Sequence, residues 1–314
     1  MISIHLIAPS GASLDGKSPL AGIEWLKSQG ITIQNPECVQ RVHQRFAGND
    51  VERLHELNQL AALDPKLIVM AMRGGYGIHR LLPKIEWSAI AQAVENGLQI
   101  CGHSDFTTFE LGLLAKTGAV TLSGPMLNYD FGKIDESGKT ASPDTWMWQH
   151  FLSAVRDRKL DCTVNAAQVF LGQTTTDTIR GMLWGGNLTV LASLIGTTYL
   201  PSGTQTKGGI LFLEDVNEHP YRLERTLMQL LDAGVLSNQA AIMLGGFSGY
   251  RLYDNDKGYT LESAIEVIRE RLPKAIPILT DLPFGHQANK LTLPVGAKAT
   301  LDYSATGFTL QASW

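Results

Sequence analysis

A serine directly after a short apolar segment is the first residue that could do chemistry. The segment ends at Gly102, Ser104 follows, and a helix-like pattern begins at once. A strand-to-helix turn lifts a hydroxyl clear of a sheet, which is how α/β hydrolases expose a nucleophile. The backbone N–H of Asp105, at the helix start, could stabilise an anion at the same place. The local sequence Gly-His-Ser-Asp is not G-x-S-x-G, so a plain N-cap role for Ser104 stays open.

Glycines follow a second apolar segment, residues 67–72. The sequence Arg73-Gly74-Gly75-Tyr76-Gly77 comes directly after it. In an open parallel sheet, ligands bind beyond the carboxyl ends of the strands, so this loop is expected beside Ser104. A glycine N–H and the N–H of Asp105 would then form an oxyanion hole. The loop is neither G-x-G-x-x-G nor a P-loop, which disfavours a nucleotide site. A plain glycine-rich turn is the alternative.

A carboxylate and an imidazole later in the chain could complete a catalytic group. Glu214 closes the apolar strand pattern 209–214, and a part-buried carboxylate needs a partner such as an imidazolium. Glu218 lies beside a helix start, where a capping charge is the more fitting role, although it stays a second candidate acid. His286 is the histidine in a loop context suited to a general base. His103 is expected to point away from Ser104.

The order Ser104, Glu214, His286 is that of α/β hydrolases. In this arrangement the serine attacks a carbonyl, the histidine takes and returns the proton, and the acid orients the histidine. No HExxH or comparable cluster occurs, so a metal mechanism is disfavoured.

Composition excludes several classes of protein. The chain has 314 residues, 44% of them hydrophobic and 18% charged, with a net charge of −4. These values are typical of a folded protein and argue against nucleic-acid binding, which needs basic patches. No apolar segment is long enough to span a membrane, and the N-terminus reads as a first strand rather than a signal peptide.

The three cysteines are far apart and form no CxxC, so neither a zinc site nor a disulfide framework is indicated. Free thiols predict a cytoplasmic protein. Cys101 lies close to Ser104 and is a rival nucleophile, with a buried structural thiol as the alternative.

Strand and helix patterns alternate in the first half, which predicts a doubly wound parallel sheet. Ser142-Pro143-Asp144 is expected to cap a helix that runs to about residue 156, with proline at its first position. Residues 128–141 are expected to form a loop. The predicted elements are strands at 2–8, 31–33, 67–72 and 119–122, and helices at 19–29 and 50–63, the latter opened by an Asn49–Glu52 capping box.

The second half mixes both kinds of element and ends in alternating, turn-punctuated segments typical of antiparallel strands. We predict an α/β nucleophile domain at 1–157, a linker region at 158–180 and a β-rich domain at 181–314 that carries the acid and the base. The predicted elements of this half are strands at 209–214 and 240–244, helices at 220–233 and 261–271, and antiparallel strands after residue 290.

Six motifs in order resemble the LD-carboxypeptidase family, the S66 serine peptidases. The resemblance runs over nearly the whole chain and is weakest at 128–141 and 161–178. The motifs are Arg73-Gly74-Gly75-Tyr76-Gly77, Gly102-His103-Ser104-Asp105-Phe106-Thr107, Ser123-Gly124-Pro125-Met126, Leu183-Trp184-Gly185-Gly186-Asn187-Leu188, Leu213-Glu214-Asp215-Val216-Asn217-Glu218-His219-Pro220 and Phe284-Gly285-His286.

The resemblance implies Ser104 as nucleophile, Glu214 rather than Glu218 as the acid, His286 as base, and Gly75 and Asp105 as backbone oxyanion donors. It implies a Rossmann-like, flavodoxin-like N-terminal domain, a smaller β-rich α+β C-terminal domain and a homodimer. The implied reaction needs no cofactor and removes the terminal D-alanine from a murein tetrapeptide by cutting the L,D bond after meso-diaminopimelate. The implied setting is the cytoplasmic recycling of cell-wall fragments.

Substrate contacts are predicted for Arg73, Tyr76 and Trp184. A carboxypeptidase must bind a free carboxylate, for which Arg73 and Arg80 are candidates, each with a structural role as the alternative. Trp184 could wall the pocket or lie in the core. Rival functions are a microcin-immunity-type peptidase acting on an acylated nucleotide, a non-catalytic muropeptide-binding module, and an amidotransferase-like enzyme that uses Cys101.

Overall fold

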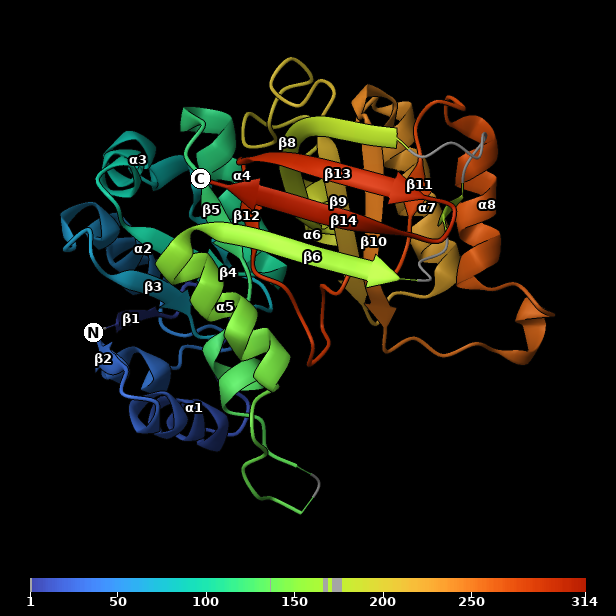
Figure 1. The fold of residues 1–314 in the computed structure, drawn as a ribbon. Helices are drawn as coiled ribbons and strands as arrows, with labels where there is room; N and C mark the ends of the chain where they lie inside the picture. The colour runs from blue at the N-terminus through green and yellow to red at the C-terminus, as the bar shows by residue number, and fades with distance from the viewer. Residues whose placement is uncertain (1, 136, 166–168, 171–176) are drawn as a thin grey trace.

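The computed structural model describes residues 2–135, 137–165, 169–170 and 177–314. It contains two sheets with helices packed on them, which confirms the predicted α/β fold class (Figure 1). The N-terminal sheet lies on the left in Figure 1, and the second, curled sheet lies on the right.

The first sheet has five parallel strands and one antiparallel edge strand, in the order β12-β5-β4-β3-β1-β2 among the described residues. Its strands are β1 (Ser3–Ile7), β2 (Thr32–Gln34), β3 (Ile68–Ala71), β4 (Gln99–Gly102), β5 (Thr121–Ser123) and β12 (Leu293–Val295). The edge strand β12 comes from the far end of the chain and pairs antiparallel with β5. The C-terminal part of the chain therefore contributes directly to the N-terminal sheet.

Both faces of this sheet are buried, because successive side chains of a strand point to opposite sides. In β3, Val69 and Ala71 belong to one hydrophobic cluster, whereas Ile68 and Met70 belong to another. The first cluster includes residues of α2 (Asp50–Gln59), α3 (Trp87–Glu95) and α4 (Thr107–Thr117). The second includes residues of α1 (Lys17–Ser28) and α5 (Thr145–Asp157). Helices thus cover both faces, as in a doubly wound sheet.

The second sheet has the order β6-β14-β13-β8-β9-β10-β11-β7 in the part of the chain that is described. Its strands are β6 (Lys159–Asn165), β7 (Val169–Phe170), β8 (Asp177–Asn187), β9 (Ile210–Val216), β10 (Ala241–Ser248), β11 (Ile278–Leu279), β13 (Lys298–Ser304) and β14 (Gly307–Ser313). The predicted antiparallel tail is confirmed by the β13–β14 pairing. Parallel pairing of β8, β9, β10 and β11 forms the other half of the sheet.

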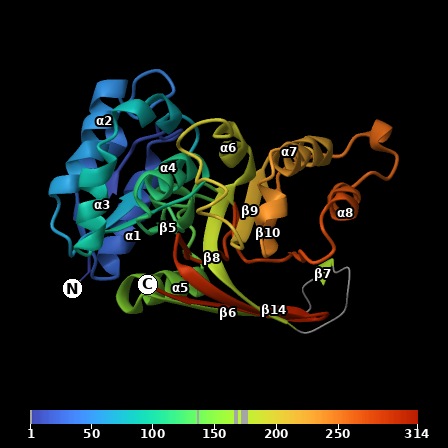
Figure 2. The same ribbon diagram turned by 90° about the horizontal axis from the view of Figure 1, so that it is seen from above.

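Among the described residues, three α-helices accompany this sheet: α6 (Leu188–Ser193), α7 (Pro220–Asp232) and α8 (Leu261–Arg271). In the view from above, α4 and α6 lie between the two sheets, where they contact each other (Figure 2). The first hydrophobic cluster continues from the N-terminal sheet into these helices and β9. This continuous core therefore fixes the position of the carboxyl end of β4 relative to the carboxyl end of β9.

Two local expectations differ from the structure. Asp144, not Ser142, is the N-cap of α5, so Pro143 lies before the helix rather than at its first position. The segment predicted as a loop from residue 128 begins within a π-helical turn, Leu127–Phe131, which packs against α1. In the predicted linker 158–180, residues 159–165 form β6 and pair with β14, while residues 166–168 and 171–176 lie outside the described residues. No helix in the described part of the chain is long and apolar enough to cross a membrane.

Candidate active site

The Ser104 turn joins β4 to α4 through a short 3-10 segment, Ser104–Phe106. Ser104 has φ +62°, in the left-handed region, which costs a non-glycine residue about 1–2 kcal/mol. Strain of this kind persists only where the surroundings impose it. The turn places Ser104 in the wall of a cavity of about 520 Å³. The expectation of a sharp strand-to-helix turn at this serine therefore matches the observed backbone.

The His286 imidazole lies in the same cavity wall, on the loop between β11 and β12. Its Nδ1 is 2.8 Å from Oε2 of Glu214, which is fully buried in β9. Because a carboxylate can only accept, Nδ1 carries the proton and donates it, and Nε2 keeps a free lone pair. Gly285 has φ +129°, and a Cβ there would lie 3.1 Å from the same carboxylate oxygen. A side chain at this position would therefore crowd the pairing of Glu214 with His286.

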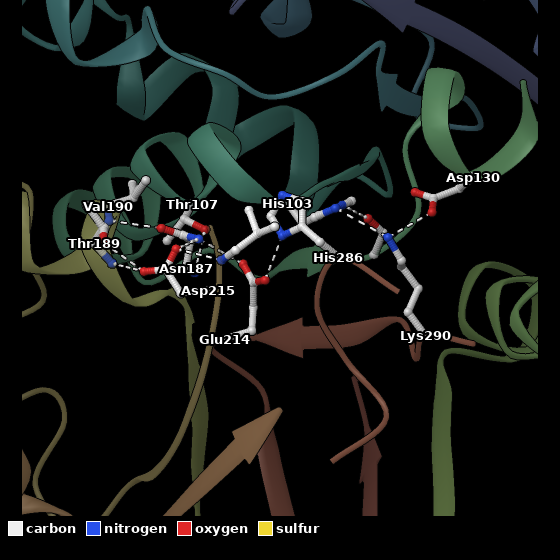
Figure 3. A network of polar contacts seen from close by, with 12 residues as sticks. His103, Thr107, Asp130, Asn187, Thr189, Val190, Glu214, Asp215, His286 and Lys290 are labelled. Carbon is white, nitrogen blue, oxygen red and sulfur yellow. Dashed lines mark hydrogen bonds and ion pairs between the residues drawn. The ribbon is translucent and has the colours of Figure 1, made fainter. Parts of the chain in front are cut away.

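A second set of hydrogen bonds holds the other oxygen of Glu214 (Figure 3). The Asn187 amide donates to Glu214 Oε1 at 3.1 Å and to Asp215 Oδ1 at 3.0 Å. The Asn187 backbone N–H donates to Thr107 Oγ1, at the start of α4. Since α4 directly follows the serine turn, this network connects the acid to the segment that carries Ser104.

Neighbouring residues of a strand point to opposite faces, yet the carboxylates of Glu214 and Asp215 contact the same Asn187 amide. Asp215 also accepts from the backbone N–H and hydroxyl of Thr189, at 2.9 and 2.7 Å. Burial raises the pKa of Asp215 above its ordinary value, with the neighbouring Glu214 acting in the same direction. Asn187 therefore separates two close carboxylates and gives each a donor, as buried acids require.

The glycine loop after β3 packs against the serine turn. A Cβ at Gly74 would lie 2.6 Å from Ser104 Oγ and 3.2 Å from the backbone nitrogen of Asp105, so no larger residue fits this approach. Gly75 lines the cavity. The Asp105 side chain instead accepts from Ser10 Oγ at 2.7 Å and from the Ile78 N–H at 3.2 Å. Burial raises its pKa. The glycine loop and the serine turn thus lie against each other, and the role of the Gly75 and Asp105 N–H groups as oxyanion donors stays a prediction.

Two of the three predicted substrate residues, Arg73 and Tyr76, lie at the cavity or beside it. Arg73 lines the cavity, donates to the Ala12 carbonyl at 2.7 Å, and stacks its guanidinium 5.6 Å from the Tyr129 ring centre. Tyr76 is 44% exposed and lines an adjoining hollow that shares Arg73 and Gly75 with the cavity.

Trp184 and Arg80 do not reach this cavity. Trp184 is fully buried in β8, and its Nε1 donates to Gln239. The prediction that Trp184 walls the substrate pocket is wrong, because its strand lies inside the sheet and turns the ring into the core. Arg80 forms an ion pair with Asp50 at 2.8 Å.

The rival catalytic residues are also placed by the structure. Cys101 is fully buried, its thiol lies 3.5 Å from the Pro125 carbonyl, and burial raises its pKa well above the ordinary value. A thiol in this state is a poor nucleophile. Glu218 lies 3.7 Å from Arg222 and does not line the cavity.

His103, Asp130 and Lys290 line the cavity, and sequence reasoning missed all three. His103 was expected to point away from Ser104; it nevertheless lines the same cavity, and its ring centre is 5.1 Å from that of His286. Lys290 follows His286 by four residues, and this spacing within one loop was the available signal. Asp130 lies in the segment predicted as a loop. The described residues contain no group of three or more His, Cys, Asp or Glu side chains that could hold a metal ion.

Comparison with known proteins shows which family this chain resembles. The family model of the LD-carboxypeptidase N-terminal domain matches residues 4–124, and that of the LD-carboxypeptidase C-terminal domain matches residues 180–301. A solved structure of muramoyltetrapeptide carboxypeptidase from Oxalobacter formigenes is 39% identical, with a TM-score of 0.86 over 99% of both chains.

Two relatives align with most of this chain and with most of their own length. The murein tetrapeptide carboxypeptidase of Pseudomonas aeruginosa is 28% identical over 95% of this chain and 92% of its own. The microcin C7 self-immunity protein of Escherichia coli is 29% identical over 90% of this chain and 84% of its own. The two family models together span most of the sequence, and this chain belongs to the LD-carboxypeptidase family of serine-type peptidases.

Proposed function

We propose that this enzyme is a serine carboxypeptidase that hydrolyses the L,D bond between meso-diaminopimelate and the terminal D-alanine of murein tetrapeptides. The observation that carries the proposal is the cavity itself. It is lined by a serine in a left-handed turn and by a histidine whose Nδ1 is held by a buried carboxylate. Relatives named murein tetrapeptide and muramoyltetrapeptide carboxypeptidase support the substrate.

In the proposed reaction, the Ser104 hydroxyl attacks the carbonyl carbon of the scissile bond while Nε2 of His286 takes its proton. Glu214 orients the imidazole and stabilises the imidazolium that forms. Backbone N–H groups of Gly75 and Asp105 are proposed to stabilise the oxyanion. His286 then protonates the leaving amine of D-alanine, and water, activated by the same base, releases the peptide from the serine.

D-alanine release is the experiment that tests this function. Purified protein is incubated with L-Ala-γ-D-Glu-meso-diaminopimelate-D-Ala, and free D-alanine is measured by mass spectrometry for the wild type and for Ser104→Ala. Release by the wild type alone is expected. Release by both proteins would show that Ser104 is not the nucleophile.

Release by neither protein would contradict the proposed substrate. An aminoacyl sulfamoyl nucleoside is then the second substrate to test, because the microcin immunity relative has been solved with aspartyl sulfamoyl adenosine. The cytoplasmic setting, the part in cell-wall recycling and the homodimer remain predictions from the resemblance.

Arg73 is proposed to bind the terminal carboxylate of the substrate. It lines the cavity, and its buried Nε has no hydrogen-bond partner among the described residues. Arg73→Ala is expected to raise KM about tenfold or more, with a smaller effect on kcat, because a charge-assisted hydrogen bond is lost. Steady-state kinetics on the tetrapeptide measure this effect.

Arg80→Ala is the matched control, because Arg80 pairs with Asp50 and does not line the cavity. Its KM is expected to stay at the wild-type value. A substrate that ends in D-alaninamide removes the carboxylate, so on it Arg73→Ala and the wild type should differ little. An equal loss on both substrates would contradict carboxylate binding by Arg73.

A further inference from the structure

A buried ion pair lies in the wall of the active-site cavity, and the proposed reaction does not use it. Lys290 Nζ is 2.7 Å from Asp130 Oδ1, and the two side chains are only 2% and 3% exposed. The other oxygen of Asp130 accepts the Met126 backbone N–H at 2.7 Å. Burying two charges costs desolvation free energy that an ion pair on the surface does not cost. Because of this cost, a role in the active site would explain why the pair is buried in the cavity wall.

Lys290 contacts His103 as well as Asp130 (Figure 3). Its Nζ is 3.3 Å from His103 Nε2, and His103 Nδ1 is 2.8 Å from the Gly124 carbonyl oxygen. The carbonyl can only accept, so Nδ1 carries the proton. The ammonium can only donate, so Nε2 must offer its lone pair. These two contacts leave His103 a single neutral tautomer.

His103 is also the neighbour of the proposed base. The two rings meet edge to face, with centres 5.1 Å apart. When His286 takes the serine proton it becomes a cation, and a protonated His103 at this distance would repel it. Burial, the Lys290 ammonium and His286 together hold the pKa of His103 well below its ordinary value.

We propose that Lys290 is a positioning residue that acts through His103: it keeps this ring neutral, so that His286 can accept the serine proton at mildly acidic pH. Asp130 holds the ammonium in place. The proposal rests on the proposed function only through the role of His286. The contacts that fix the state of His103 do not depend on the substrate.

The charges that face His103 come from several elements. Lys290 and His286 lie on the loop before β12, and the Gly124 carbonyl follows β5. Asp130, in the π-helical turn, acts through Lys290, and Glu214 of β9 acts through His286. Arg73 and Lys133 line the same cavity. Lys290 alone among these groups donates to His103 Nε2 in the described part of the chain.

The first test is the pH dependence of kcat/KM for D-alanine release between pH 5 and 8. The variant is Lys290→Met combined with Asp130→Asn, because the asparagine leaves no unpaired buried charge and still accepts from Met126. The acid limb is expected to move to higher pH by about one unit. Adding His103→Asn should move it back, and Lys290→Arg alone should leave it near the wild type. Lys66→Met, at an exposed lysine, is the control.

The other outcomes would overturn the proposal in different ways. A higher KM with an unchanged pH profile would make Lys290 a substrate-binding cation. A lower melting temperature with an unchanged profile would make the pair purely structural. A shifted limb that His103→Asn does not restore would show that Lys290 acts on His286 directly.

A second measurement is independent of activity. The His103 ring signals, followed by NMR, are expected to stay constant from pH 8 to 5 in the wild type. In the Lys290→Met/Asp130→Asn variant the signals should change with pH, because the pKa of His103 is expected to rise toward the ordinary histidine value of 6.5. A constant His103 signal in both proteins would overturn the proposal. An inactive wild type with the expected NMR result would instead contradict only the proposed substrate.

Discussion

Ser104→Ala is expected to lower kcat for D-alanine release by about four to six orders of magnitude and to leave the fold intact. The hydroxyl is the group that would form the acyl intermediate, so its loss leaves only binding and oxyanion stabilisation. Alanine has almost the same volume, and Ser104 is only half-buried, so packing changes little. Single-turnover kinetics and a melting curve measure the two effects separately.

The three proposed catalytic residues should also behave as a unit. Glu214→Ala and His286→Ala are each expected to remove most activity, and the triple variant with Ser104→Ala should be little worse than Ser104→Ala alone. Ser193→Ala, at an exposed serine on α6, is the matched control and should keep wild-type turnover. Near-normal turnover of His286→Ala with a normal melting curve would show that another group is the base.

Gly74→Ala is expected to lower kcat about a hundredfold or more, because the new methyl group would collide with Ser104. The added Cβ would lie 2.6 Å from both Cβ and Oγ of Ser104. The serine turn must therefore shift, and a displacement of about 1 Å at a reacting atom costs roughly a hundredfold in rate. Overpacking of this kind costs about 1–3 kcal/mol in stability.

Gly203→Ala controls for the loss of a glycine as such. Gly203 has no strained φ, and the closest atom to an added Cβ there is 3.8 Å away. Its kcat and melting temperature should stay close to the wild-type values. Equal turnover of Gly74→Ala and Gly203→Ala would mean that the position of Ser104 is not critical for the reaction.

Local patterns predicted most elements because the deciding interactions are close in sequence. The Asn49 capping box is present, with the asparagine accepting from two backbone N–H groups and Glu52 bonding back. The helix predicted at 261–271 has the bounds of α8, whose cap Thr260 accepts from Ser263. Caps of this kind act within four residues, so a single sequence displays them completely.

Elements decided by distant partners were not predictable in the same way. The π-helical turn Leu127–Phe131 has no local periodic signal and packs against α1. The strand β6 falls in the predicted linker because its partner β14 lies at the other end of the chain. Strand β12 enters the first sheet, although its sequence neighbours β11 and β13 belong to the second.

By itself, the sequence determined the alternation of strands and helices and singled out Ser104, Glu214 and His286, because each follows a local pattern of apolar segment, glycine or turn. Only the tertiary structure decided which distant residues share a wall of the cavity. It brought Lys290, Asp130 and His103 together and turned Trp184 into the core. The physical reason is that a side chain's direction and burial depend on strand register and on packing between the two sheets, which no short stretch of sequence contains.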